Sequence, residues 1–211
     1  MSNVVEQPTI CGKPIEGRKH ICAFVDSRDQ QYEILLPFLL QGLASNDMIL
    51  SIVDPSNVVD HYSRCRRKGI DLTQLEAGGK ACTFVFENAY LKDGYFSADR
   101  MVRMVETTLA TARQKGFDSV RGFGEMHWAL TGLPGTEELV EYECRVNEVV
   151  QHDPLVCIYD VNRFPGRVLM DVLCTHPKVI LNGQIVENEF YVPPEQFLAA
   201  YRARTHKGHA A

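Results

Sequence analysis

The stretch FVDSRDQQYEILLPFLLQGL, residues 24–43, decides the fold because it joins an apolar strand to a helix. The apolar run ends at Asp26, and apolar residues resume at helical spacing between Tyr32 and Leu43. In nucleotide-binding proteins, such a strand–loop–helix junction carries a glycine-rich loop with a lysine that cradles phosphate. Residues 26–33 contain neither glycine nor lysine. The junction therefore predicts a degenerate phosphate loop, and we expect no ATPase activity.

The rest of the chain alternates strands with helices. Segments such as ICAFV, ILSIV and LVCIY are apolar on both faces, which indicates strands buried on both sides. Buried strands joined by helices form a mostly parallel sheet with helices above and below it. The sequence therefore predicts a three-layer α/β fold. The predicted strands are residues 20–25, 48–53, 81–86, 119–123, 155–159 and 178–181, and the predicted helices are residues 32–43, 55–68, 98–115, 137–151, 166–173 and a last helix from residue 193.

The length of the chain fits a single domain. Its 211 residues, 45% of them hydrophobic, suffice for one full core. Residues 1–17 contain prolines and glycines without periodicity, so we expect a flexible N-terminal arm there. A single domain is expected over residues 18–203, and the polar end of the chain predicts a tail over residues 204–211.

Composition argues against several function classes. The net charge of −5 gives no basic surface for nucleic acid, so no direct nucleic-acid partner is expected. No apolar run approaches the ~18 residues that span a bilayer, so no membrane association is expected. The seven cysteines are odd in number and form no CxxC pair. This usage indicates free thiols in a reducing compartment and hence a cytoplasmic protein.

A carboxylate follows each of five predicted strands. The carboxyl ends of parallel strands share one edge of the sheet, where ligands bind in open α/β proteins. Acids at this edge repel phosphate but suit a cation, an amine, a metal or a neutral polar ligand. The alternative is that each acid only caps a helix or a turn, which fits the first two best. The five acids are Asp26, Asp54, Glu87, Glu125 and Asp160.

Other polar and aromatic residues are also expected at this predicted crevice. Glu125 opens the chemically dense stretch Glu125-Met126-His127-Trp128, in which Trp128 offers either a flat pocket wall or a core side chain. Glu143 shares a helix face with Asn147, four residues on, and that face could point at the crevice. Tyr159 precedes Asp160 at the end of its strand.

The chain resembles the MEDS family, the sensory domain named after methanogens, methylotrophs and the DcmR repressor. The resemblance runs from about His20 to Phe197 and includes GEMHWAL, EYECRVNE, CIYDVNRFPG, LCTHPKVI and ENEFYVPPEQF. It implies a RecA/KaiC-like core without its phosphate loop. It also implies the sensing of small organic compounds such as hydrocarbon derivatives. MEDS domains commonly occur beside DNA-binding or histidine-kinase modules, and no such module is recognisable in these 211 residues.

Two pairs of soft ligands suggest a metal site. His20-x-Cys22 and Cys174-x-His176 could together hold zinc or copper if the two pairs meet in space. The alternative is that the cysteines are core residues and His176 caps a helix. His20 lies at the start of its strand, at the edge opposite the acids. The expectation is therefore no cofactor, with this metal site as the weaker alternative.

Together these features predict a stand-alone, non-catalytic sensor of a small organic ligand. No serine elbow such as GxSxG is present, which disfavours an enzyme. The alternative is a metalloprotein or enzyme that uses the Glu125/His127 region or the two His/Cys pairs. The expected partner is a separate signalling protein, such as a histidine kinase or transcription regulator, and a homo-oligomer is compatible with the sequence. The candidate ligand-binding residues are Asp26, Asp54, Glu125, Trp128, Glu143, Tyr159, Asp160, His20 and His176.

Overall fold

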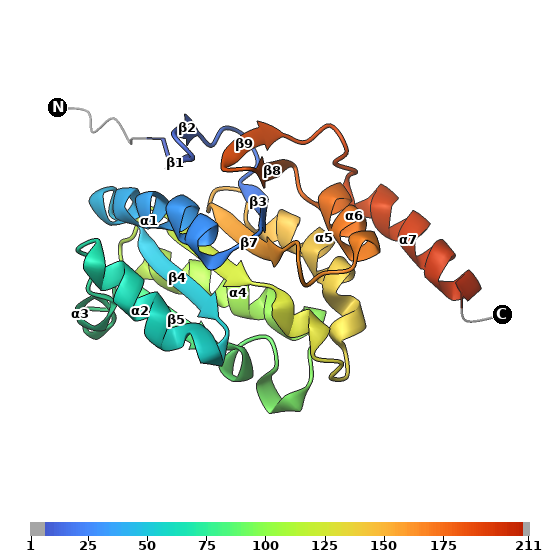
Figure 1. Ribbon diagram of the computed structural model, residues 1–211, viewed down its shortest axis with the longest axis horizontal. Helices are drawn as coiled ribbons and strands as arrows, with labels where there is room; N and C mark the ends of the chain where they lie inside the picture. The colour runs from blue at the N-terminus through green and yellow to red at the C-terminus, as the bar shows by residue number, and fades with distance from the viewer. Residues whose placement is uncertain (1–6, 209–211) are drawn as a thin grey trace.

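The centre of the molecule is a seven-stranded sheet (Figure 1). The computed structural model describes residues 7–208. The sheet order is β5-β4-β6-β7-β3-β8-β9, and every neighbouring pair is parallel except the last, β8 and β9. The strands are β3 (His20–Val25), β4 (Met48–Val53), β5 (Ala81–Val85), β6 (Val120–Glu125), β7 (Leu155–Asp160), β8 (Lys178–Leu181) and β9 (Gln184–Glu187).

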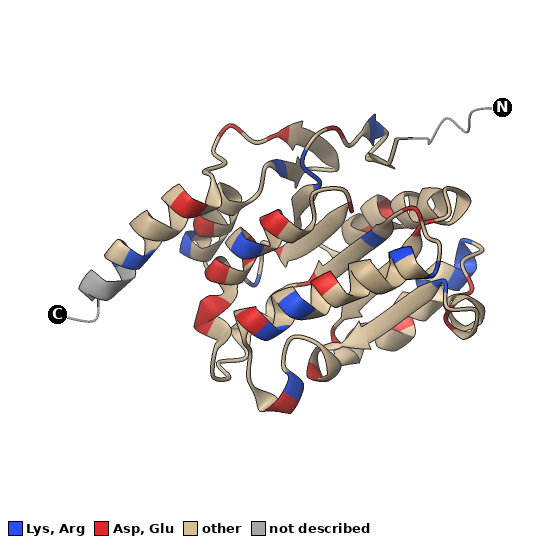
Figure 2. Ribbon diagram, turned by 180° about the vertical axis from the view of Figure 1, so that it is seen from behind, with Lys and Arg blue, Asp and Glu red and all other residues tan. Residues whose placement is uncertain are grey.

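Helices cover both faces of this sheet. In Figure 1, α1, α2 and α3 lie in front of the sheet and α4 lies behind it, and the reverse view of Figure 2 places α4 in front. Helix α7 projects away from the body. The helices are α1 (Arg28–Ala44), α2 (Val58–Arg67), α3 (Leu72–Ala77), α4 (Ala98–Gln114), α5 (Leu139–Val149), α6 (Gly166–Thr175) and α7 (Pro194–Gly208), with short 3-10 turns at Pro55–Asn57, Phe86–Asn88, Lys92–Gly94, His127–Leu130 and Thr136–Glu138.

The two faces of the sheet carry separate hydrophobic cores. Strand β4 shows the division, because Leu50 and Ile52 belong to the core beneath α4 and α5, whereas Ile49 and Val53 belong to the core beneath α1 and α2. Side chains alternate between the faces of a strand, so a strand that serves two cores is apolar throughout. The predicted three-layer, mostly parallel α/β fold is therefore confirmed.

Helix α1 begins four residues earlier than predicted. Ser27 is its N-cap, and its hydroxyl accepts a hydrogen bond from the backbone N–H of Gln30. This cap leaves only Asp26 and Ser27 between strand and helix. Arg28 therefore belongs to the first helical turn, at the edge where a phosphate loop would stand.

The N-terminal arm and the polar tail differ from the expectation. Residues 1–6 and 209–211 lie outside the described part, but β1 (Thr9–Ile10) and β2 (Lys13–Pro14) pair as a small hairpin. Ile10 and Ile15 are buried in the core beneath α1, and this burial outweighs the turn-forming composition of the segment. The predicted tail is also helical as far as Gly208, since α7 continues through it.

A buried arginine ties α1 to the sheet. Arg121 of β6 donates to the Asp47 carboxylate at 2.9 and 2.7 Å and to the carbonyl of Phe38 in α1 at 3.0 Å. A Cβ atom at Gly42 would lie 2.7 Å from the Arg121 side chain. Glycine at position 42 therefore makes room for this ion pair.

Trp128 lies in the core beneath α4 and α5. It is fully buried and stacks on Tyr90 and Phe96, with ring centroids 4.8 and 4.1 Å apart. Its predicted role in ligand binding stays a prediction, but this packing gives it a structural role.

We expect Trp128→Ala to lower the free energy of unfolding by about 3–5 kcal/mol, because the substitution leaves a large cavity between two stacked rings. Urea denaturation followed by circular dichroism measures this loss. Phe190→Ala is the control, since Phe190 is 67% exposed and its removal should change stability by about 0.5 kcal/mol or less. Equal effects of the two substitutions would contradict the structural role of Trp128.

Candidate functional site

Four metal-ligand atoms meet in the interior, near the amino end of β3. They are Nε2 of His20, Oε2 of Glu143, Sγ of Cys157 and Nε2 of His176, and all lie within 4.8 Å of one another. Glu143 Oε2 is 3.3 Å from the His20 nitrogen, 3.4 Å from the His176 nitrogen and 3.5 Å from the Cys157 sulfur. The His20 nitrogen is 3.4 Å from the same sulfur. We call these four residues the buried cluster.

Four different elements supply the buried cluster. His20 is the first residue of β3, and Cys157 lies in the neighbouring strand β7. Glu143 comes from α5, which covers this face of the sheet, and His176 follows the last residue of α6 in extended conformation. All four side chains are at most 1% exposed. The parallel pairing of β3 with β7 and β8 thus brings distant parts of the chain together.

Further polar side chains hold the buried cluster in place. Tyr159 donates a hydrogen bond to Oε1 of Glu143, the oxygen that faces away from the histidines. His176 Nδ1 lies 2.9 Å from the carbonyl oxygen of Val172. Asn147, one turn after Glu143, donates to the carbonyl oxygen of Thr175 at 2.8 Å. The donors and the backbone therefore fix both the carboxylate and one imidazole ring.

Burial sets the protonation states of these groups. It lowers the pKa of His20 to about 4, and the neighbouring His176 acts in the same direction. Burial also raises the pKa of the Cys157 thiol well above its usual range, and the Glu143 carboxylate adds to this effect. Burial disfavours the Glu143 carboxylate too, but the imidazoles of His176 and His20 outweigh it and hold the pKa of Glu143 well below its usual range. The low pKa of Glu143 thus requires a positive charge beside the carboxylate, and His20, with its own pKa of about 4, does not supply that charge at neutral pH.

The structure unites residues that the sequence suggested for different reasons. His20 and His176 were predicted as ligand-binding residues and, in the weaker alternative, as metal ligands. Glu143 and Tyr159 were predicted as residues of the crevice at the opposite edge. All four meet at the buried cluster or contact it. Cys157 was missed, although it is two residues before Tyr159 and so on the same face of its strand.

The two other cysteines of the predicted metal set do not join it. Cys22 lies in β3 with its sulfur 3.9 Å from the carbonyl oxygen of Lys178, two residues beyond His20 along the strand. Cys174 belongs to α6 and packs against Val140 and Phe197. A helix end separates Cys174 from His176, so their spacing does not place them on one strand face. The cluster that the structure forms therefore contains Glu143 and Cys157, and it does not contain Cys22 or Cys174.

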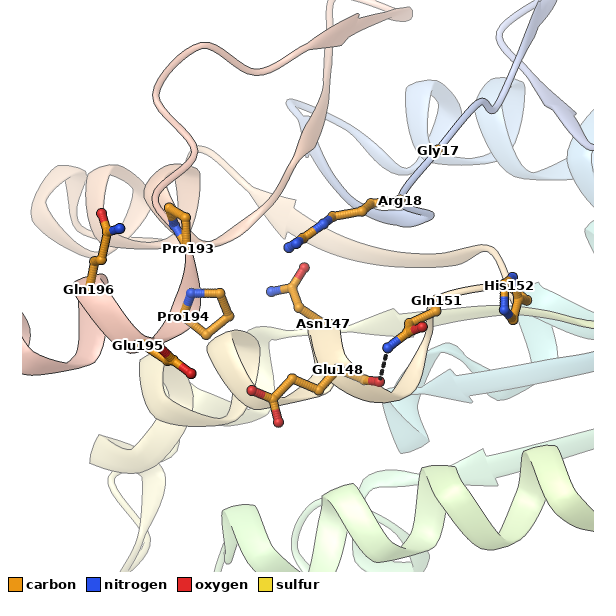
Figure 3. Close-up of a pocket in the computed structure, with 10 residues that line it drawn as sticks. All are labelled: Gly17, Arg18, Asn147, Glu148, Gln151, His152, Pro193, Pro194, Glu195 and Gln196. Atoms are coloured by element: carbon orange, nitrogen blue, oxygen red, sulfur yellow. Dashed lines mark hydrogen bonds between the residues drawn. The ribbon is translucent and has the colours of Figure 1, made fainter.

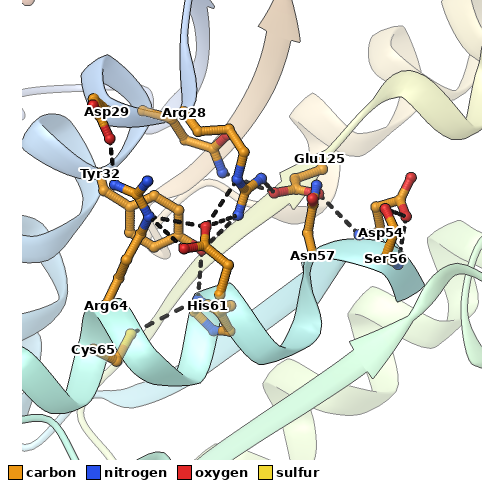
Figure 4. A network of polar contacts seen from close by, with 12 residues as sticks. Arg28, Asp29, Tyr32, Asp54, Ser56, Asn57, His61, Arg64, Cys65 and Glu125 are labelled. Carbon is orange, nitrogen blue, oxygen red and sulfur yellow. Dashed lines mark hydrogen bonds and ion pairs between the residues drawn. The ribbon is translucent and has the colours of Figure 1, made fainter.

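A second polar network occupies the carboxyl edge of the sheet (Figure 4). Glu125, at the end of β6, is 1% exposed and accepts four hydrogen bonds. Its Oε1 accepts from Arg28 at 2.8 Å and from Gln31 at 2.9 Å. Its Oε2 accepts from the backbone of Asp54 at 2.9 Å and from the Asn57 side chain at 3.0 Å. These donors outweigh burial and lower the pKa of Glu125.

Arg28 extends this network to α2. Its guanidinium also pairs with Asp60 at 2.9 Å, and Arg64 bridges Asp60 and Asp29 at 2.9 and 2.7 Å. Figure 4 shows the Arg28 side chain reaching from α1 towards Glu125 and α2. These charged side chains at the carboxyl edge thus have their ion-pair and hydrogen-bond partners among one another.

The five acids do lie at one edge of the sheet, each at or just after the carboxyl end of its strand. Their hydrogen-bond partners, however, differ from one acid to the next. Asp54 binds His127 Nε2 at 2.6 Å and accepts from the Ser56 backbone at 2.7 Å. Asp160 accepts from the Asn162 backbone at 2.9 Å, and the Asn162 side chain donates to the Asp26 carbonyl at 2.8 Å. These contacts match the capping and turn alternative. Glu87 is exposed.

A hollow of about 610 Å³ lies between the end of α5, the segment before β3 and the start of α7 (Figure 3). Asn147 is only 6% exposed, yet it borders this hollow and also contacts the segment that carries His176. We call this feature the Asn147 hollow. Its lining residues are Gly17, Arg18, Asn147, Glu148, Gln151, His152, Pro193, Pro194, Glu195 and Gln196.

Comparison with solved structures agrees with the fold. A KaiC-like protein from Pyrococcus horikoshii matches with a TM-score of 0.52 and 12% identity, over 81% of this chain and 73% of that one. A second protein from the same archaeon, solved with an unknown peptide, matches with a TM-score of 0.55 and 15% identity, over 79% and 78% of the two chains. The RecA/KaiC-like core expected from the sequence is therefore confirmed.

Sequence comparison identifies the family. The transcriptional repressor DcmR of Methylorubrum extorquens is 24% identical over 180 residues, which cover 79% of this chain and 61% of the repressor. The chain thus spans about three fifths of that repressor. The family model described as MEDS, MEthanogen/methylotroph, DcmR Sensory domain, matches residues 19–177. This match extends over most of the sequence, and the chain belongs to the MEDS family of sensory domains.

Proposed function

We propose that this protein senses a small polar organic molecule in the Asn147 hollow and passes the signal to a separate regulatory protein. The observation that carries the proposal is the position of Asn147, which borders the hollow on one side and the buried cluster on the other. The sensory family and the similarity to a repressor support a regulatory role.

The carboxyl edge is a poorer place for a ligand. A buried carboxylate that already accepts four hydrogen bonds has little capacity left for a metal ion or an amine. A ligand that displaced Arg28 would also have to replace its ion pairs with Glu125 and Asp60. These contacts argue against nucleotide binding at the carboxyl edge. They also argue against the crevice at that edge, suggested by the sequence, as the binding site of the ligand.

A second hollow, of about 760 Å³, lies between α1 and α2. It borders the network of the carboxyl edge through Tyr32 and Arg64, but Arg64 is already paired with Asp29 and Asp60. The Asn147 hollow differs, because Asn147, which lines it, also donates to the carbonyl oxygen of Thr175, the residue before His176. A molecule bound in this hollow would therefore act on the segment that carries a residue of the buried cluster, which favours this hollow as the binding site.

The lining of the Asn147 hollow indicates the class of ligand. Arg18 offers a cation, Glu148 and Glu195 offer carboxylates, and Gln151 and Gln196 offer amides. Such a mixed set suits a small molecule with both donors and acceptors better than a polyphosphate or a purely apolar compound.

The separate regulatory protein that we propose as the partner is a transcription regulator or a histidine kinase.

Among the described residues, no helix combines the length and the apolar character needed to cross a bilayer. All seven cysteines are free thiols, as the sequence predicted. The cytoplasmic location stays a prediction that these free thiols support.

We expect no tight binding of Mg-ATP, because Arg28 and the short Asp26–Ser27 connection replace a phosphate loop. Isothermal titration calorimetry should give a dissociation constant weaker than about 10 μM, which corresponds to about 7 kcal/mol of binding. A saturable, tighter interaction, or phosphate release above the level of a buffer blank, would contradict this expectation.

We expect Gln151→Trp, which narrows the Asn147 hollow, to weaken ligand binding at least ten-fold, or about 1.4 kcal/mol. Native mass spectrometry of protein purified from its own host identifies the molecule that travels with it, and calorimetry then measures its affinity. Asp26→Asn at the carboxyl edge is the control and should bind as the unchanged protein does. Weaker binding in the control alone would place the ligand at the carboxyl edge instead.

We expect Glu125→Gln to destabilise the protein by about 2–3 kcal/mol. The substitution replaces a carboxylate oxygen, which accepts hydrogen bonds, with an NH₂ group, and this group then faces donors with which it cannot form hydrogen bonds. Glu125 has a lowered pKa in the folded state, so its contribution is present above its usual pKa of about 4.3 and is lost as the pH falls below that. Urea denaturation at pH 7 and at low pH measures both effects. The exposed Glu87→Gln is the control, and a loss as small as that of the control would contradict the network.

A further inference from the structure

We propose that His20, Glu143, Cys157 and His176 together bind one divalent transition-metal ion. The inference rests on the proposed sensory function, because it makes the ion the centre that a molecule in the Asn147 hollow would affect. Two imidazoles, a carboxylate and a thiol form a ligand set of nitrogen, oxygen and sulfur. Such a set is typical of zinc and its first-row neighbours and unsuited to magnesium or calcium.

The spacing of the ligand atoms fits a tetrahedral ion. With metal–ligand bonds of about 2.1 Å, the corners of a tetrahedron lie about 3.4 Å apart. Four of the six separations among the ligand atoms are 3.3, 3.4, 3.4 and 3.5 Å, and the other two are at most 4.8 Å. Four atoms from four elements thus already stand close to the positions that a zinc ion requires.

Hydrogen bonding at His176 directs a lone pair of its ring to the centre of the buried cluster, where the ion would lie. The Val172 carbonyl oxygen only accepts, so Nδ1 of His176, 2.9 Å away, carries the hydrogen. In the neutral ring, Nε2 then has a lone pair and no hydrogen. That nitrogen has no hydrogen-bond partner and lies 3.4 Å from Glu143 Oε2. A lone pair facing a carboxylate oxygen is repulsive unless a cation lies between them.

Supporting contacts follow the pattern of metal sites. In such sites, a ligating imidazole donates its other N–H to a carbonyl or carboxylate, and ligating carboxylates are themselves hydrogen-bonded. His176 has its partner in Val172, and Glu143 has its partner in Tyr159, which leaves Oε2 for the ion. Tyr159 is therefore a positioning residue.

Charge balance favours a divalent ion. Binding breaks the S–H bond of Cys157, releases one proton to solvent and leaves a thiolate bound to the metal. The thiolate and the Glu143 carboxylate then carry two negative charges, which the ion neutralises. The buried site is thus uncharged when it is loaded, as a site with at most 1% exposure requires.

The main alternative is that a proton occupies the place of the metal. His176 would then be an imidazolium paired with Glu143, and the buried cluster would be a purely structural ion pair. Cobalt(II) distinguishes the two, because a tetrahedral cobalt–thiolate site has strong visible bands and a thiolate charge-transfer band in the near ultraviolet.

The test uses the full chain, freed of metal with a chelator and titrated with cobalt(II) and then zinc(II). We expect about one ion per chain, the two sets of bands, their loss when zinc replaces cobalt, and release of one proton per ion in weak buffer. Cys157→Ser should lose the charge-transfer band, and Tyr159→Phe should weaken metal binding about 10–100-fold while keeping the spectrum.

Cys22→Ser and Cys174→Ser are the matched controls, since both remove a cysteine of the same region that lies outside the buried cluster. They should keep the stoichiometry and the bands, and circular dichroism confirms that each variant is folded. Absence of bound metal and of bands in the unchanged protein, or an unchanged spectrum in Cys157→Ser, would overturn the proposal.

The outcomes also separate this inference from the proposed function. Protein that carries an organic molecule from its host but binds no cobalt would refute the metal site and leave the sensory function standing. Protein that binds cobalt, but in which no molecule from the host alters the spectrum or the calorimetric signal, would retain the metal site and refute sensing in the Asn147 hollow.

Discussion

A carboxylate that has no contact with water must be paired, and this constraint shapes both ends of the sheet. Glu125 and Glu143 are each at most 1% exposed. Glu125 is surrounded only by donors, namely a guanidinium, two amides and a backbone N–H, so its pairing is complete without any ligand. Glu143 has one firm donor, Tyr159, on Oε1, while Oε2 faces two imidazole nitrogens and a thiol. The first arrangement stabilises the fold, and the second leaves a position that a cation fits.

The closed carboxyl edge follows from one short stretch of sequence. Ser27 caps α1 directly after the strand, so Arg28 stands in the first helical turn and reaches Glu125. A glycine-rich loop at this place would have presented backbone N–H groups to phosphate. Here a side chain supplies the positive charge permanently, and it also binds Asp60 of α2. The sheet thus has the layered architecture seen in KaiC-like proteins, while its candidate site lies at the opposite edge.

Sequence reasoning predicted the layers well and the site only in part. The bounds of β3, β4 and β8 agree with the predicted strands, because fully apolar runs mark strands buried on both faces. Strand β9 was missed, although Asn182-Gly183, both with positive φ, form a hairpin turn before it. Cys157 was missed because its place beside His20 depends on the register of β3 and β7, which no local pattern reveals. Glu143 was found by its helix spacing, but that spacing does not tell which edge of the sheet the helix covers.

Helix α5 connects the candidate site to the surface. Its inner face carries Glu143, whose Oε2 lies beside both histidines, and the next residue, Cys144, packs with Val140 against Phe197 of α7. A helix moves as a rigid unit when a buried side chain on it is displaced, since close-packed interiors resist local deformation. A change in the ligands around Glu143 that shifts α5 therefore also shifts the surface on which α7 rests. Because α7 projects from the body (Figure 1), a displacement of α5 reaches a helix that extends away from the sheet.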